Sequence, residues 1–273
     1  MCGRYVQVSK LEVVEKRFNA VATEPELFQP DYNIGAGSKA MVITCEEPHK
    51  IQWYRFGFCP SWSKKDMYLL NARAEGDHNP NDDPHYTGGM GIIQKPAYRD
   101  AIRYRRCLVI ADCFYEGSKH DGLNKPYVVY VRERRPFAFA GIYSSWQHPE
   151  KGEHIHSFAI ITSVANELMM RIGHHRSPVI LSPSAETTWL KQDAPLANIT
   201  SLLHPYPVQY MNAYPVSSAV KSGKIHDRSL VEPIGERIYP EYMVGIKKDT
   251  VLQGMGSAKR NEPGAQTPGG SGS

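Results

Sequence analysis

Residues 106–117 read RCLVIADCFYEG, and the mainly apolar run from 106 to 115 predicts a buried β-strand. The run ends in Tyr115-Glu116-Gly117, which can present the Glu116 carboxyl at the wall of a cleft. Burial there would raise the pKa of the carboxyl toward the range that suits acid–base catalysis. The alternative is a rim glutamate that pairs with a nearby arginine.

Other runs rich in Val, Ile, Tyr and Phe lie on both sides of this segment and predict further strands. They cover residues 39–45, 51–58, 126–132, 137–144 and 156–162. Short helices are predicted at residues 97–104, 164–172 and 184–191. Because these helices do not alternate regularly with strands, we expect one α+β domain with mainly antiparallel strands rather than a doubly wound sheet.

Two helix starts have recognisable capping residues. Ser9-Lys10-Leu11-Glu12 is typical of a capping box that opens a helix through about Asn19. Ser182 is the expected N-cap of the helix at 184–191, and Pro183 is its first helical residue.

The composition sets limits on the class of protein. The chain has 273 residues, of which 41% are hydrophobic, so it can bury a substantial core. Lys and Arg exceed Asp and Glu by 32 − 28 = 4, a mild positive charge that permits a polyanionic partner without requiring one. There is no run of ~18 apolar residues for a membrane span and no apolar stretch of a signal peptide. We therefore expect a cytoplasmic protein with no membrane partner.

The cysteines are Cys2, Cys45, Cys59, Cys107 and Cys113. A sparse and odd set argues against a disulfide framework and leaves at least one thiol free. No Cys-x-x-Cys pair occurs, so a zinc site has little support, and we expect no metal or other cofactor.

Cys2 can take part in a reaction that is not available to the other cysteines. Removal of Met1 would leave a free α-amine, with a pKa of ~7.7–8.0, beside the Cys2 thiol. The neutral amine can condense with an aldehyde to an imine, and the thiol can then close a thiazolidine ring. The alternative is that Cys2 is an incidental residue near the start of the chain.

Two further candidates are Asn71 and Arg73 in the segment Leu70-Asn71-Ala72-Arg73-Ala74-Glu75. Asparagine offers both donors and an acceptor, and arginine offers a fork that suits phosphate. The alternative is a strand end with a solvated arginine. His174 precedes a predicted buried strand and is placed to donate a proton, since the pKa of histidine lies near neutrality.

A basic run that includes Arg99 and Arg106 can line a phosphate-binding groove or form a solvated face. Trp62 is one of several aromatic residues that can stack on bases, although most aromatic residues belong to the core. Residues 76–94 form a long polar loop, and loops of this length are often functional or mobile. Residues 254–273 are rich in Gly, Ser and Pro and predict a disordered tail.

Several short motifs occur in a fixed order along the chain. They are Met1-Cys2-Gly3-Arg4-Tyr5, Tyr32-Asn33-Ile34, Gly57-Phe58-Cys59-Pro60-Ser61-Trp62, Asn71-Ala72-Arg73-Ala74-Glu75, Lys95-Pro96-Ala97-Tyr98-Arg99, Arg106-Cys107-Leu108, Phe114-Tyr115-Glu116, Phe139-Ala140-Gly141-Ile142 and His174-x-Arg176-x-Pro178. Tyr214-Pro215-Val216-Ser217 and Val231-Glu232-Pro233 follow. The ordered set resembles the SOS response-associated peptidase (SRAP) family over residues 1–236. That leaves an extension at 237–253 before the tail.

The resemblance implies a compact domain with a curved antiparallel sheet core, and a monomer that binds single-stranded DNA containing abasic sites. It implies that Cys2 bonds covalently to the ring-opened sugar after autocatalytic removal of Met1. Asn71 would position the sugar or Cys2, Glu116 would be the acid–base group, and His174 would assist ring opening and imine protonation. Arg4 and Arg73 would hold flanking phosphates, and Trp62, Arg99 and Arg106 would complete the DNA contacts. The protein would associate with the nucleoid when bound to damaged DNA.

The chain departs from the family pattern at several places. Gly117 stands where the family has a tryptophan, and His174-His175-Arg176-Ser177-Pro178 replaces His-Asp-Arg-Met-Pro. Asn33-Ile34-Gly35-Ala36-Gly37 lacks the usual proline, and the loop at 76–94 is longer than is typical. Two rival hypotheses are a cysteine hydrolase with an N-terminal nucleophile and a noncovalent single-strand binder.

Overall fold

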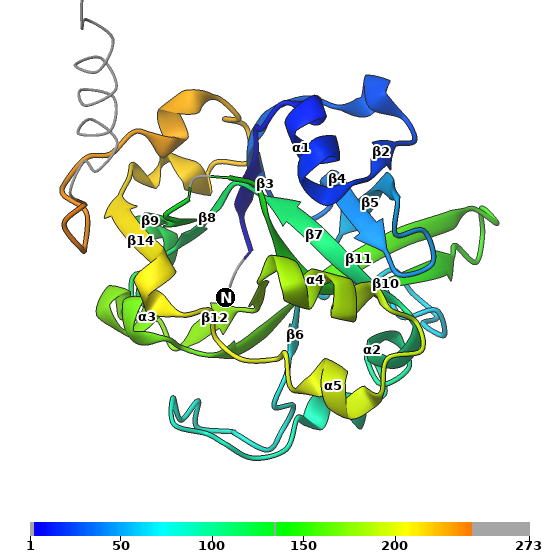
Figure 1. The fold of residues 1–273 in the computed structure, drawn as a ribbon. Coiled ribbons are helices and arrows are strands. Elements are labelled where there is room, and N and C mark those ends of the chain that lie inside the picture. The colour runs from blue at the N-terminus through cyan, green and yellow to red at the C-terminus, as the bar shows by residue number, and fades with distance from the viewer. Residues whose placement is uncertain (1–2, 134, 242–273) are drawn as a thin grey trace, which may run out of the picture. The chain divides into compact units, whose positions relative to one another are not determined.

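Two sheets and a few short helices make up the part of the chain that the computed structural model describes, residues 3–133 and 135–241 (Figure 1). The helices are α1 (Leu11–Phe18), α2 (Ala101–Tyr104), α3 (Glu167–Ile172), α4 (Pro183–Leu190) and α5 (Leu196–Thr200). None of them combines the length and apolar character that crossing a bilayer requires.

The smaller sheet has five strands, and the larger has nine, of which seven follow one another along its path and two pair beside it. In spatial order the smaller is β14 (Met211–Pro215), β9 (Tyr127–Val131), β8 (Cys113–Glu116), β1 (Tyr5–Gln7) and β3 (Asp31–Ile34). The larger contains β12 (Arg176–Pro178), β11 (His154–Val164), β10 (Phe137–Gln147), β7 (Arg106–Ala111), β4 (Lys39–Thr44), β5 (Lys50–Phe56) and β2 (Val21–Ala22), with β13 (Ile180–Leu181) on β10 and β6 (Asn71–Arg73) on β11.

The larger sheet curves until two of its strands meet. β11 pairs with β10 and also with β5, where Phe158 lies opposite Phe56 in parallel register. The pairing therefore runs through β5, β4, β7, β10 and β11 and returns to β5, which closes five strands into a ring. The other pairings around the ring are antiparallel. The predicted α+β class and the curved, mainly antiparallel core are confirmed.

β7 lies at the centre of the structure and is buried along its whole length. Val109 joins the core cluster that contains Phe114 of the smaller sheet, whereas Leu108 joins the cluster that contains Trp189 of α4. A strand that is covered on both faces has a continuous apolar sequence. This explains why the sequence shows an unbroken run here instead of an alternating one.

The predicted strand at 106–115 is wrong in one respect, because Asp112 divides it. Its carboxylate accepts the backbone N–H groups of Val8 and Ser9 at 2.6 and 2.9 Å, and the Ser9 hydroxyl also bonds to it. The chain therefore leaves the larger sheet after β7 and enters the smaller sheet as β8. The predicted capping box fails for the same reason. Ser9 is occupied by Asp112, and Lys10 is the N-cap of α1 without a side-chain bond.

The other predicted helices and strands are present with shifted ends, and Ser182 caps α4 by accepting the N–H of Ala185. One compact unit extends as far as Tyr239, close to the predicted boundary at residue 236. The predicted tail at 254–273, and the predicted extension from residue 242 onward, lie outside the described residues.

Arg106 requires a correction, since its side chain is not part of a surface groove. It is 1% exposed, and its guanidinium donates to the carbonyls of Trp189 at 2.8 Å and Lys191 at 2.6 Å. It also donates to the carbonyls of Ile102 and Arg103 within α2. The guanidinium thus satisfies carbonyls of two helical segments that pack against β7, and the side chain is not available at the surface.

We predict that Arg106→Met lowers the free energy of unfolding by about 2–4 kcal/mol, because it leaves several buried carbonyls without a donor. Urea denaturation measures the change. Arg99→Met is the matched control. Arg99 is exposed and its nearest carboxylate, Asp100, lies 4.0 Å away, so its loss should change stability by less than about 0.5 kcal/mol. Equal stability of the two variants would contradict the structural role of Arg106.

Candidate active site at the end of strand β8

A cavity of about 440 Å³ lies where β8 ends, beside the residues that precede β1 and those that follow α3. Its lining residues are Gly3, Arg4, Ala36, Leu70, Tyr115, Glu116, Gly117, Ser118, Lys119, Gly122, Leu123, His174 and His175. The pairing of β1 with β8 brings the start of the chain here, and the Tyr115 N–H donates to the Arg4 carbonyl at 3.0 Å. The cavity therefore gathers Glu116 and His174 beside Gly3.

Glu116 and His174 form a buried pair in the wall of the cavity. The Glu116 Oε2 and His174 Nε2 atoms are 3.5 Å apart, and the two side chains are 6% and 5% exposed. His174 Nδ1 lies 2.9 Å from the Gly117 carbonyl oxygen. Because a carbonyl only accepts, Nδ1 carries a proton, and in the neutral ring Nε2 directs its lone pair toward Glu116.

Burial sets the protonation states of this pair. It raises the pKa of Glu116 from 4.5 to about 7, since the ionised carboxylate loses its hydration. It lowers the pKa of His174 from 6.5 to about 3, since the imidazolium is disfavoured in the same way. On this basis His174 accepts rather than donates a proton near neutrality, which differs from the expectation from the sequence. Glu116 exchanges a proton at neutral pH, and His174 is a neutral acceptor.

The turn after α3 places His174 in the wall of the cavity. Asn166 caps the helix by accepting the Met169 N–H at 3.0 Å, and Gly173 ends it with φ +82°. This left-handed conformation suits glycine, and it turns the chain so that the His174 N–H donates back to the Met169 carbonyl at 2.8 Å. Antiparallel pairing of β12 with β11 then holds the following residues.

Gly117 shows why the tryptophan of the family pattern is absent. A Cβ atom at this position would lie 1.9 Å from the Gly122 carbonyl oxygen. The segment 118–123 thus occupies the space that a side chain at 117 would need. Ser118, Lys119 and Leu123 supply this wall of the cavity instead.

Arg4 is oriented by Asn33. Arg4 Nη1 donates to Asn33 Oδ1 at 2.7 Å, and Nη2 donates to the Lys221 carbonyl at 3.2 Å. Asn33 is buried, and its amide donates to the carbonyls of Ser222 and Ile225, both at 2.8 Å. Asn33 belongs to one of the sequence motifs, but the sequence did not indicate that it orients Arg4. The bonds from Asn33 to Ser222 and Ile225 join positions almost 200 residues apart, and no local sequence pattern predicts them.

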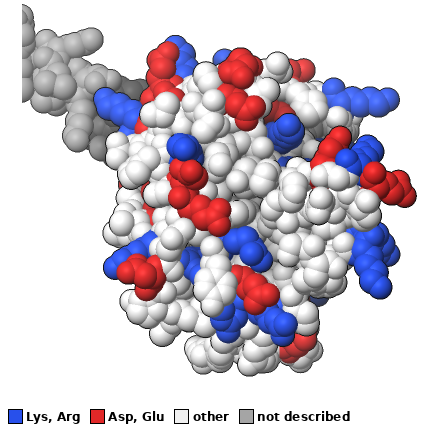
Figure 2. All heavy atoms as spheres, turned by 90° about the vertical axis from the view of Figure 1, so that its right-hand side faces the viewer, with Lys and Arg blue, Asp and Glu red and all other residues white. Residues whose placement is uncertain are grey.

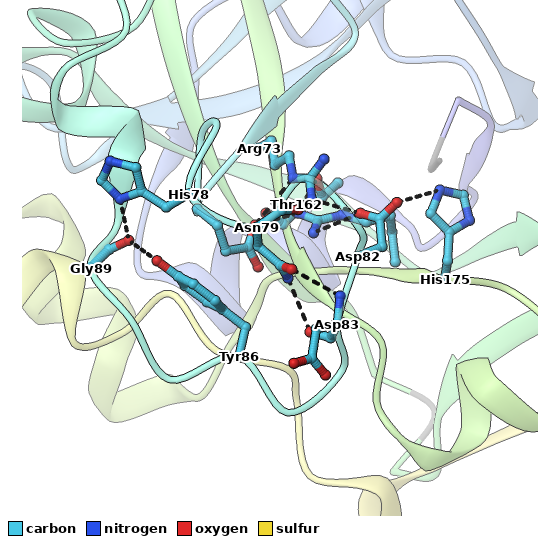
Figure 3. A network of polar contacts seen from close by, with 11 residues as sticks. Arg73, His78, Asn79, Asp82, Asp83, Tyr86, Gly89, Thr162 and His175 are labelled. Atoms are coloured by element: carbon cyan, nitrogen blue, oxygen red, sulfur yellow. Dashed lines mark hydrogen bonds and ion pairs between the residues drawn. The ribbon is translucent and has the colours of Figure 1, made fainter.

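The other predicted site residues lie around the cavity. Asn71 begins β6 directly after the lining residue Leu70, to whose carbonyl its amide donates at 3.0 Å. Arg73, at the other end of β6, is held in a polar network with Asp82 (Figure 3). Trp62 is 61% exposed, and Arg99 is also exposed. Cys2 lies outside the described residues.

Sequence reasoning also missed His175, Arg176 and Asp82. His175 lines the cavity beside His174, and its Nε2 lies 3.7 Å from Asp82 Oδ2. Arg176 is buried, and Asp82 belongs to the long polar loop. Only the unusual length of that loop pointed toward a role for it.

The remaining chemistry of the described chain is limited. Cys45, Cys59, Cys107 and Cys113 are buried free thiols, and burial raises the pKa of each. In residues 3–133 and 135–241, no three His, Cys, Asp or Glu side chains gather as a metal site. Figure 2 shows basic and acidic side chains mixed on the face that it draws, so that face has no broad field of one sign.

The fold and the site define an α+β protein with a buried acid–base pair beside its N-terminal strand. The chain belongs to the SOS response associated peptidase (SRAP) family, whose model matches residues 1–223.

Among its relatives, the abasic site processing protein YoqW of Bacillus subtilis is 33% identical over 239 residues, which cover 85% of this chain and 99% of YoqW. The abasic site processing protein YedK of Escherichia coli is 26% identical, in an alignment that covers 86% of this chain and 100% of YedK. A crystal structure of a Bacteroides thetaiotaomicron protein aligns with a TM-score of 0.73 and 26% identity, over 86% of this chain and 100% of that one.

We predict that Glu116→Gln stabilises the folded protein at alkaline pH. The folded state of the wild type binds more protons than the unfolded state between pH 4.5 and about 7, because the pKa of Glu116 is raised. The free energy of unfolding of the wild type therefore falls as pH rises through that window. Glutamine lacks this penalty, so the variant should gain on the wild type by about 2–3 kcal/mol between pH 4 and pH 8.

Urea denaturation across this pH range measures the difference between the two proteins. His174 has the opposite slope, since its lowered pKa favours the folded state as pH rises from about 3 to 6.5, but it is present in both proteins. Glu24→Gln is an exposed control that should show no such gain. A difference between wild type and Glu116→Gln that does not vary with pH would show that Glu116 ionises as an ordinary carboxyl.

Proposed function

We propose that this protein binds single-stranded DNA at an abasic site and bonds covalently to the ring-opened sugar through Cys2. The names of the relatives above support abasic sites as the substrate. The observation that carries the proposal is the buried Glu116–His174 pair, whose proton exchanges at neutral pH, in a cavity lined by Gly3.

The choice of Cys2 rests on chain connectivity and on the state of the other thiols. Gly3, which follows Cys2 directly in the sequence, lines the cavity. The four described cysteines are buried with raised thiol pKa values, which makes them weak nucleophiles. Cys2 alone can also supply an α-amine, once the bond between Met1 and Cys2 has been hydrolysed. We propose that the protein removes Met1 autocatalytically.

The proposed reaction begins with opening of the sugar ring. Protonated Glu116 donates to the ring oxygen as the ring C–O bond breaks, and the proton of the hemiacetal hydroxyl passes by way of His174 Nε2 to the Glu116 carboxylate 3.5 Å away, so that the aldehyde forms and Glu116 is protonated again. The Cys2 amine adds to the aldehyde carbon, and loss of the hydroxyl as water leaves an imine. The thiol sulfur then adds to the imine carbon, and its proton passes to the nitrogen, which closes a thiazolidine. A group with a pKa of about 7, such as Glu116, can both donate and accept the protons of these steps.

The remaining contacts position the strand. Asn71 holds the sugar or the Cys2 amine from the start of β6. Arg4 and Arg73 neutralise flanking phosphates, while the exposed Trp62 and Arg99 extend the contact along the strand. We propose that the protein works as a monomer in the cytoplasm and joins the nucleoid when it is bound to damaged DNA.

Cys2→Ala should abolish the covalent product on a short single strand that contains one abasic site. A thiazolidine survives a denaturing gel, so the wild type should show a shifted band and the variant none. Cys2→Ser keeps the amine and should give only an imine that a hydride reductant traps. Cys113→Ala, which removes a buried thiol, should crosslink like the wild type.

Intact mass of the wild type should show that Met1 is absent. Retention of Met1 in active protein, or a stable crosslink with Cys2→Ala, would refute the assignment. Turnover of a generic amide substrate without any crosslink would favour a hydrolase, and reversible binding alone would favour a noncovalent binder.

Glu116→Gln should slow crosslinking by about 10²–10⁴-fold while leaving the affinity for an intact single strand nearly unchanged. Glutamine preserves the shape of the side chain but does not exchange a proton at neutral pH. Single-turnover crosslinking across pH, beside equilibrium binding of an intact strand, separates the two effects. Crosslinking at the wild-type rate would move the acid–base role to another group. Loss of intact-strand binding would show that Glu116 maintains the shape of the cavity instead.

A further inference from the structure

The segment between Gly76 and Gly91 leaves the fold and returns at nearly the same point. The Ile92 N–H donates to the Ala74 carbonyl at 3.0 Å. A Cβ atom on Gly91 would lie 2.5 Å from the Glu75 carbonyl oxygen, and one on Gly76 would lie 2.8 Å from the Gly91 carbonyl carbon. The glycines thus allow the two ends to touch. Residues 77–90 form a compact loop of the Ω type, which can move as a unit about its closed base.

Polar contacts hold this loop, and an apolar core does not. Within residues 77–90, all of which the structure describes, Asn79 is the one buried residue. Asn79 braces the loop from inside through two bonds with the Asp83 backbone, at 2.9 and 3.0 Å. The Asn79 carbonyl also accepts a bond from Arg73. Few buried apolar contacts mean that opening the loop exposes little hydrophobic surface.

Asp82 is the acidic side chain by which the loop reaches the site (Figure 3). Its Oδ1 lies 2.8 Å from Arg73 Nη2 and 3.5 Å from Arg176 Nη1. Its Oδ2 lies 3.7 Å from Nε2 of His175, a residue that lines the cavity. Asp82 holds this position with φ +55°, a left-handed conformation that aspartate and asparagine tolerate better than most residues.

The charges around Asp82 balance only while the loop is closed. Arg176 is 2% exposed and bonds to Glu75 Oε2 at 2.7 Å, and Arg73 Nε lies 3.7 Å from the same carboxylate oxygen. Two arginines therefore face two carboxylates, Glu75 and Asp82. If Asp82 withdraws, the single carboxylate of Glu75 faces both guanidinium groups, the buried Arg176 at 2.7 Å and the partly exposed Arg73 at 3.7 Å. One net positive charge then remains in this partly desolvated place, so the open state favours the binding of another anion.

We propose that Asp82 covers the phosphate position to which the proposed function assigns Arg73, and which the neighbouring Arg176 completes, whenever DNA is absent. Carboxylate and phosphate suit the same guanidinium fork, so one can replace the other without rebuilding the site. Residues 77–90 are then an autoinhibitory lid. A strand that enters the cavity displaces Asp82, and the loop swings out about Gly76 and Gly91. This inference rests on the proposed function, because it takes single-stranded DNA as the competing anion.

If residues 77–90 are a lid, weakening the contact of Asp82 with the two arginines should raise the affinity for DNA. Asp82→Asn removes the charge but keeps the shape and the tolerance for positive φ. It should bind an intact single strand about 3–10-fold more tightly than the wild type, since a larger fraction of the protein is already open. Asp83→Asn is the matched control. Asp83 is the next residue and is exposed, and its carboxylate accepts only the His85 N–H among the contacts described. The same change in net charge should therefore alter affinity less than about twofold.

Hydrogen exchange gives a second readout that needs no DNA. Amides of residues 77–90 should exchange faster in Asp82→Asn than in the wild type and Asp83→Asn. In the wild type they should exchange faster in inorganic phosphate than in chloride at equal ionic strength. If Asp82→Asn binds DNA no better than Asp83→Asn, or if loop exchange responds to neither change, Asp82 is a structural brace and the lid is refuted. If the wild type binds no single strand, the proposed function fails, and the exchange in phosphate still decides whether Asp82 covers an anion site.

Discussion

Desolvation of the Glu116 carboxyl is the constraint on which the site depends. A carboxylate in water would be ionised at neutral pH and would serve poorly as a proton donor. At the end of β8 it lies against the His174 ring, and its pKa rises to about 7. The same burial keeps His174 neutral, so the pair holds one exchangeable proton where two ordinary side chains would have stored opposite charges.

Glycine residues allow the close backbone packing around Glu116 and around the neighbouring loop. The wall beside Glu116 closes because segment 118–123 packs against Gly117, at a distance that excludes even a Cβ atom. Gly173 allows the turn that returns His174 to the cavity, and Gly76 and Gly91 let the ends of the loop meet. In each case a backbone approach sets the position of a charged or titratable side chain nearby.

Three arginines of the chain show that one residue type serves different purposes according to its surroundings. Arg106 binds backbone carbonyls in the core, and Arg4 is aimed by the buried Asn33. Arg176 is neutralised by Glu75 and Asp82 beside the cavity. Guanidinium groups are costly to bury without partners, so the partners of each arginine determine whether it stabilises the fold or remains ready for an anion.

The sequence by itself determined the α+β class, most of the strands and helices and the family, and it singled out Glu116 and His174 as candidate site residues. These follow from local periodicity, from caps such as Ser182 and from motifs in a fixed order. Tertiary structure alone decided that Asp112 breaks the strand at 106–115, that Arg106 is internal, that His174 is neutral and that Asp82 covers Arg176. Each of these depends on groups that are distant in sequence, as when Arg176 meets Glu75 across 101 positions. The reason is physical: a pattern of neighbours predicts which face of a segment is apolar, whereas a pKa or an ion pair depends on how much water the rest of the fold removes.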